Sequence, residues 1–160
     1  MKLKARMTAA IIAVAAIVAP ALHAEQDLIL VDYAAIADAV AANPDNYRAL
    51  TTRFEQSDTT LTLPELATVY YGFAFTPEYN PDAEYPEIGE ALDKNDVSLA
   101  IALCDEVLRK NPVSLPTLFT LFGCCAISEN PTINARKESV RDRILMLCDL
   151  INASGLGVQP

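Results

Sequence analysis

The sequence contains no tryptophan and a single histidine, His23. His23 lies in an N-terminal segment that we expect to be removed, so the mature chain would carry no imidazole if cleavage follows Ala24. Without histidine there is no Ser-His-Asp triad, no Cys-His pair, no imidazole general base and no histidine metal ligand. These absences argue against several common classes of enzyme.

Basic residues are scarce as well. The chain has 12 lysines and arginines against 21 aspartates and glutamates, a formal net charge of −9. This balance repels the phosphates of nucleic acids and anionic lipid headgroups, so binding to DNA, RNA or a membrane surface is disfavoured. With 52% hydrophobic residues and only five glycines, the 160-residue chain is typical of one globular domain rather than of a disordered protein.

The long apolar run near the N-terminus, residues 7–18, is shorter than the roughly 20 residues that span a bilayer, and Pro20 interrupts it. Three basic residues precede the run and small residues follow it, which is the layout of a secretory signal peptide. We therefore predict a signal peptide over residues 1–24, with cleavage after Ala21 or Ala24, and no membrane anchor afterwards. The mature domain, residues 25–160, would be exported to the periplasm or the extracellular space.

Polar caps and prolines divide the mature chain into short helices. Asp32 precedes an apolar stripe that ends at Asn43-Pro44, which predicts a first helix with an aspartate N-cap. We expect Asp45 or Asn46 to cap a second helix that runs through Phe54, because the apolar spacings of three and four residues continue to that point.

A capping box, Thr62 with Glu65, predicts a third helix from Leu63 to about Phe73, and the proline-rich residues 74–89 are expected to form an ordered loop. Apolar runs at 28–31 and 59–63 lack hairpin partners. The sequence thus predicts a mostly α fold with little or no sheet. The three remaining helices are expected from Asn95-Asp96 to Asn111-Pro112, from Ser114 to Ile127, and from Asn130-Pro131 or Thr132 to Ser154-Gly155.

Residues 96–126 resemble part of a tetratricopeptide repeat, which implies antiparallel helical hairpins. Asn111-Pro112 ends the first predicted helix of this stretch as in the second helix of such a repeat. The next helix has the residue spacing of the following repeat's first helix, with aromatic residues in place of the usual tryptophan and leucine. The resemblance covers about one repeat. Its residues are Asp96, Ala100, Ile101, Leu108, Asn111, Pro112, Phe119, Phe122, Gly123 and Ala126.

Over residues 28–155 the chain resembles the secreted bacterial family catalogued as domain of unknown function 4919. The most distinctive match is Tyr70-Tyr71-Gly72-Phe73, followed by Tyr79-Asn80-Pro81. The family has no established activity, so the resemblance assigns no catalytic residue. Its other matches are Asp32, Tyr33, Ile36, Tyr47, Leu50, Arg53, Phe54, Leu61, Thr62, Glu65, Phe75, Asn95, Asp96, Asn111 and Pro112.

Much of the aromatic content is concentrated between residues 70 and 85. These side chains either hold the proline-rich loop on the helices or form a recognition surface, because tyrosines present a large contact area with little rotamer entropy. The candidate binding residues are Tyr70, Tyr71, Phe75, Tyr79, Asn80 and Tyr85. The same loop is acidic, which would attract a basic partner or a cation, although the spacing is not that of a calcium loop.

The four cysteines lie in the second half of the chain and lack the spacing of a metal site, so we predict neither metal nor cofactor. They form either a core of buried thiols or one disulfide from Cys104 to Cys124 or Cys125. A paired-carboxylate hydrolase using Glu65, Asp82, Glu84 or Glu87 is an alternative, but no tryptophan provides a sugar platform. We expect a module that binds a protein or peptide rather than an enzyme; a structural accessory domain is the third possibility.

Overall fold

The computed structural model describes residues 28–155, and this part of the chain consists of α-helices, one short 3-10 helix and no strand. The mostly α prediction is confirmed, whereas the predicted signal peptide, residues 1–24, lies outside the described residues. The elements are α2 (Tyr33–Ala42), α3 (Pro44–Glu55), α4 (Leu63–Gly72), η1 (Phe73–Phe75), α5 (Pro86–Asp93), α6 (Val97–Lys110), α7 (Leu115–Ile127) and α8 (Pro131–Ala153).

The first two helices share one asparagine at their junction. Asp32 caps α2 as predicted, since its Oδ1 accepts from the backbone N–H of Ala35 at 2.9 Å. The prediction that Asp45 or Asn46 caps α3 is wrong, because Asn43 performs this role and accepts from the backbone N–H of Asn46 at 3.0 Å. Pro44 occupies the first turn of α3, where a missing N–H donor costs nothing.

The predicted capping box at the start of α4 is confirmed. Thr62 Oγ1 accepts from the Glu65 N–H at 3.4 Å, and Glu65 Oε2 accepts from the Thr62 N–H at 2.8 Å. Arg53 on α3 also donates to Glu65, at 2.9 Å, and to Asp58 in the connecting turn, at 2.8 Å. The capping residue therefore ties α3 to α4 as well as starting a helix.

Helix α5 corrects the prediction of one continuous loop over 74–89. The loop ends at Tyr85, and Pro86 begins a two-turn helix that buries Ile88 and Ala91. Helices α6 and α8 begin at the predicted places, Asn95-Asp96 and Asn130-Pro131, and the structure identifies their caps as Asp96 and Asn130. The helix after Ser114 is also confirmed. The Ser114 hydroxyl, however, bonds to the hydroxyl of Thr117 at 2.8 Å and makes no bond to a backbone N–H.

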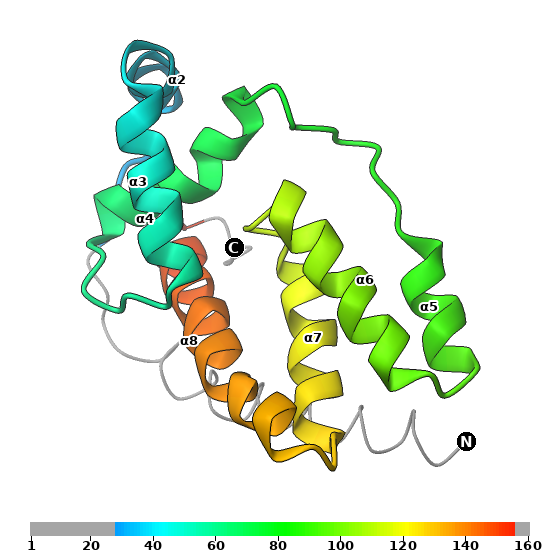
Figure 1. Cartoon of the computed structure of the whole chain (residues 1–160). Coiled ribbons are helices and arrows are strands. Elements are labelled where there is room, and N and C mark those ends of the chain that lie inside the picture. Colours follow the sequence, from blue (N-terminus) through cyan, green and yellow to red (C-terminus); the bar gives the residue numbers. More distant parts are fainter. Residues whose placement is uncertain (1–27, 156–160) are drawn as a thin grey trace.

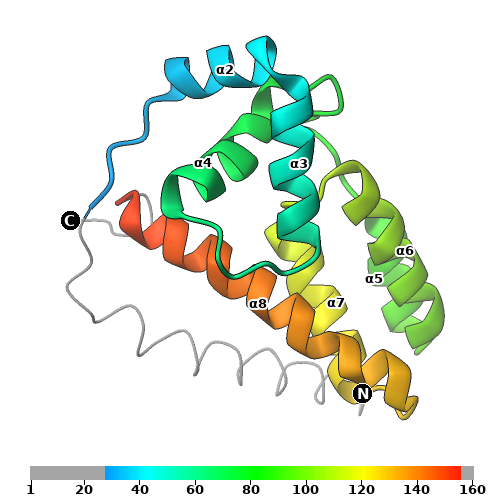
Figure 2. The same cartoon turned by 60° about the vertical axis from the view of Figure 1, so that its left-hand side comes forward.

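Helix α8 joins two groups of helices. The first group consists of α2, α3, α4 and η1, and the second of α5, α6 and α7; α8 packs on α7 and on α4 (Figures 1 and 2). Residues 76–85 cross between the groups from η1 to α5, and we call this segment the arch (Figure 1). Helices α5 to α8 each pack on the next in chain order, and their likeness to tetratricopeptide repeats stays a prediction.

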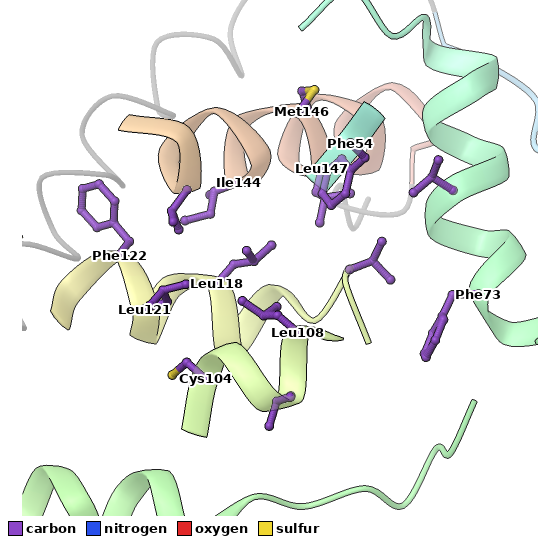
Figure 3. Packing of buried hydrophobic residues seen from close by; sticks show 14 of the residues in the cluster. Phe54, Phe73, Cys104, Leu108, Leu118, Leu121, Phe122, Ile144, Met146 and Leu147 are labelled. Carbon is purple, nitrogen blue, oxygen red and sulfur yellow. The ribbon is translucent and has the colours of Figure 1, made fainter. Parts of the chain in front are cut away.

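The hydrophobic core extends through both helix groups, and leucines and isoleucines from α6, α7 and α8 meet in one part of it (Figure 3). Phe54, fully buried, reaches this core from α3. Arg143 on α8 is only 9% exposed; its guanidinium lies 5.0 Å from the centroid of the Phe54 ring, and its Nη2 donates to the Pro112 carbonyl at 2.7 Å. This one side chain therefore links α8 to α3 and to the turn before α7.

Candidate functional site

Two adjoining hollows lie at the boundary between the two helix groups. The α3 hollow, about 640 Å³, is lined by α2, α3, η1 and the end of α6. The loop hollow, about 670 Å³, is lined by the arch, the start of α5 and the end of α6. Phe73, Glu78 and Lys110 line both hollows, so we treat the two as one continuous groove.

The local sequence explains why the chain opens a groove here. Helix α4 ends in the 3-10 turn η1, where the Thr76 hydroxyl donates to the Phe73 carbonyl at 2.8 Å. Prolines at positions 77 and 81 then keep the arch from continuing as a helix. Asn80 makes the next turn, since its Oδ1 accepts from the Asp82 N–H at 3.0 Å. The arch thus passes from one helix group to the other with its side chains around the hollows.

Four of the six predicted binding residues gather at the groove. Phe75 lines the α3 hollow with 45% of its surface exposed, and Asn80 and Tyr85 line the loop hollow. Tyr79, 44% exposed, packs edge-on against Phe73, with the ring centroids 5.8 Å apart. The end of η1 and the arch therefore present exposed aromatic surface beside a groove whose lining includes Phe73.

The structure places Tyr70 and Tyr71 away from the groove. Both are half-buried on α4, and neither lines either hollow. Tyr71 packs edge-on against Tyr70 and Tyr33, and its hydroxyl bonds to the Ser154 hydroxyl at 2.9 Å. Burial raises the pKa of Tyr70. These two tyrosines join α4 to α2 and to the end of α8, which is a structural role.

Sequence reasoning missed the side chains that α3 and α6 bring to the groove. Tyr47 lines the α3 hollow; its hydroxyl donates to the Val69 carbonyl at 3.4 Å, and burial raises its pKa. Arg109 and Lys110 reach the groove because α6 ends beside η1. Tyr47 has helical spacing with core residues, and two basic residues in the last turn of a helix favour its dipole. Neither pattern signals a site.

Uncompensated negative charge surrounds the loop hollow. Four carboxylates line it, and none of them forms an ion pair within residues 28–155; they belong to Glu78, Asp82, Glu84 and Glu87. Lys110 is the only basic residue among its lining, and the Lys110 ammonium pairs with Glu106 at 3.3 Å. The hollow is therefore arranged to attract positive charge.

Glu65, one of the carboxylates considered for hydrolysis, is already engaged elsewhere. Hydrogen bonds from the Thr62 backbone and hydroxyl, with Arg53 adding its charge, hold the pKa of Glu65 below its usual value. A general acid needs the opposite shift. Glu65 also lies outside the lining of both hollows.

The cysteines lie in the core rather than at the groove. Cys104, Cys124 and Cys125 are buried and Cys148 is half-buried, and the structure holds all four as free thiols, without the bridge that the sequence left open. Burial raises the pKa of Cys104 and of Cys124 to about 12, so these thiols are poor nucleophiles. Within the described residues no three of the usual metal-ligating side chains stand close enough together to hold an ion.

Comparison with known proteins gives a family and nothing more specific. The family model described as Domain of unknown function (DUF4919) matches residues 34–160. Neither a curated protein nor a solved structure matches the chain. No helix in the described part of the chain has the length and apolarity needed to cross a membrane.

Proposed function

The chain belongs to this family, and from that premise we propose that it is an interaction module whose groove binds an extended segment of a protein or peptide. The observation that carries the proposal is the combination of two adjoining hollows with two exposed aromatic side chains beside them, Phe75 at the end of η1 and Tyr79 on the arch. Aromatic anchors next to a concave surface are characteristic of binding hot spots.

The energetic gain would come from covering Phe75 and Tyr79. Each ring has nearly half of its surface in water, although both already pack on the protein along one side. Covering about 80 Å² on each ring would contribute about 2 kcal/mol per ring at about 25 cal/mol per Å². If a bound segment buries both rings, truncating Phe75 and Tyr79 to alanine should therefore weaken its binding at least about tenfold.

The proposal is tested by titrating the isotope-labelled mature domain with a defined peptide, acetyl-Gly-Ser-Phe-Gly-Ser-Phe-Gly-Ser-amide. We expect saturable shifts of backbone amide resonances at residues that line the groove. The Phe75→Ala/Tyr79→Ala variant should weaken binding at least about tenfold. The control Leu30→Ala/Leu99→Ala removes two apolar side chains that are at least as exposed, 96% and 46%, and that lie outside the groove.

Two results would contradict the proposal. In the first, the peptide produces no saturable shift at any groove residue. In the second, the control variant weakens binding as much as the Phe75→Ala/Tyr79→Ala variant, which would assign the effect to general stickiness. Circular dichroism of each variant checks that the helices persist.

We propose in addition that the protein is exported and that it acts outside the cytoplasm. The support is the order of basic, apolar and small residues over 1–24. Mass spectrometry of the protein purified from culture medium and cell fractions tests this. The expected species begins at Leu22 or Glu25 in a fraction outside the cytoplasm, whereas a chain retained in the cytoplasm with residues 1–24 intact would contradict it.

A further inference from the structure

We propose that the bound segment is basic, with lysine or arginine side chains that occupy the loop hollow. This inference rests on the proposed function and names the chemistry of the partner. It is carried by charge complementarity between a positive segment and a concave surface whose four carboxylates form no ion pair within residues 28–155.

The geometry of the loop hollow concentrates its negative charge. Three of its carboxylates, Glu78, Asp82 and Glu84, lie on the arch, and Glu87 faces them from the first turn of α5. The walls between them include the rings of Phe73 and Tyr85. Apolar walls lower the local dielectric, so the field of the carboxylates is stronger inside the hollow than on a flat surface. A cationic side chain gains both this field and contact with the ring faces.

The other end of the groove does not select for the same charge. The α3 hollow mixes Glu55 and Glu78 with three basic residues, Arg48, Arg109 and Lys110. Arg48 pairs with Asp45 at 2.7 Å, whereas Arg109 forms no ion pair in the described part of the chain. The basic residues of the partner therefore lie at the end next to α5, and its less charged residues lie against Phe75 and Tyr47.

The test compares three peptides that differ only in charge. The lysine and glutamate peptides have the sequence of the serine peptide above with every serine replaced by lysine or by glutamate. We expect the lysine peptide to bind the mature domain at least about tenfold more tightly than the glutamate peptide, and its affinity to fall as salt rises from about 50 to about 500 mM.

Two variants with equal net charge separate the site from the overall charge of the protein. Glu78→Gln/Asp82→Asn/Glu84→Gln neutralises the arch and should weaken the lysine peptide at least about tenfold. The control neutralises three exposed carboxylates elsewhere and should change its affinity less than about twofold. The control variant is Asp38→Asn/Glu129→Gln/Glu138→Gln.

The outcomes distinguish this inference from the proposed function. Equal weakening by the arch variant and the control would overturn the basic partner, as would equal affinity for the lysine and glutamate peptides. If the serine peptide still requires Phe75 and Tyr79, the groove remains a binding site without charge selection. If none of the three peptides produces saturable shifts at the groove, both proposals fail.

Discussion

The same substitution, glycine to alanine, should have opposite effects on stability at Gly72 and at Gly89. Gly72 ends α4 with φ −63° and ψ −26°, values that any residue adopts, so its lack of a side chain has a packing reason. A Cβ built at Gly72 would lie 3.0 Å from Val40 Cγ2 and 3.1 Å from Tyr47 Cε2. Gly89, in the middle of α5, has nothing within 4 Å of the same position.

The magnitudes follow from these contacts. At Gly72, pushing two packed side chains apart costs about 1–3 kcal/mol, and the better helix propensity of alanine returns at most about 1 kcal/mol. Gly72→Ala should therefore lower the free energy of unfolding by about 1 kcal/mol. At Gly89 only the propensity remains, so Gly89→Ala should raise the free energy of unfolding by about 0.5–1 kcal/mol.

Urea denaturation of the two variants and the wild type, followed by circular dichroism, measures both changes. In thermal denaturation, a domain of this size shifts its Tm by about 3–5 °C per kcal/mol, so the Tm values of the two variants should differ by at least about 5 °C. A Gly72→Ala protein as stable as the wild type would refute the close approach of α2, α3 and α4. Because Tyr47 lines the α3 hollow, Gly72→Ala should also weaken peptide binding, whereas Gly89→Ala should not.

Three further predictions concern side chains outside the groove. Tyr71→Phe removes the bond to Ser154 and should cost about 0.5–1.5 kcal/mol in urea denaturation with unchanged peptide affinity; weakened binding would place Tyr71 in the site. Hydrogen bonds from Thr60 and Arg53 lower the pKa of Asp58 to about 2. The stability that the ionised Asp58 contributes to the fold is therefore complete above its unfolded pKa, near 4, and is lost as the pH falls through about 2. Because the Arg53→Gln variant lacks one of these bonds, its free energy of unfolding should fall less than that of the wild type between about pH 5 and about pH 2. Denaturation at each pH measures the two falls, and equal falls would contradict this prediction. Iodoacetamide at about pH 8 should modify Cys148 first, by mass spectrometry, and modification of the buried thiols before unfolding would contradict their placement.

Local signals in the sequence located most helix ends. Asp32 and Thr62 are recognisable as caps in the sequence because a capping side chain accepts from an N–H three residues later, within one turn. The starts of α6 and α8 are recognisable to within one or two residues for the same reason. The same reasoning failed at Asn43, where one residue ends α2 and begins α3. Because Asn43 directly follows α2, the sequence indicates only that it ends this helix and not that it also caps the next one.

Helix α5 escaped prediction because its local sequence favours a loop whereas its packing favours a helix. Pro86 and Gly89 are typical of loops, although proline is tolerated in the first turn of a helix and glycine costs a helix only about 1 kcal/mol. Packing of Ile88 and Ala91 against α6 outweighs that cost. Caps and apolar periodicity give no information on tertiary contacts of this kind. A prediction based on them therefore makes the loop too long.

The groove depends on tertiary structure still more strongly, because its lining comes from three separate stretches, 40–55, 73–87 and 109–112. Arg143 connects these stretches to the core: it donates to the carbonyl of Pro112, which lines the α3 hollow, and it covers the ring of Phe54 on α3. Burial lowers the pKa of Arg143, and among the residues that the structure describes its Nε has no acceptor. A buried, incompletely paired guanidinium is a poor choice for stability alone. Its two contacts join Pro112, in the turn between α6 and α7, to Phe54 on α3, and so link two of the segments that line the α3 hollow.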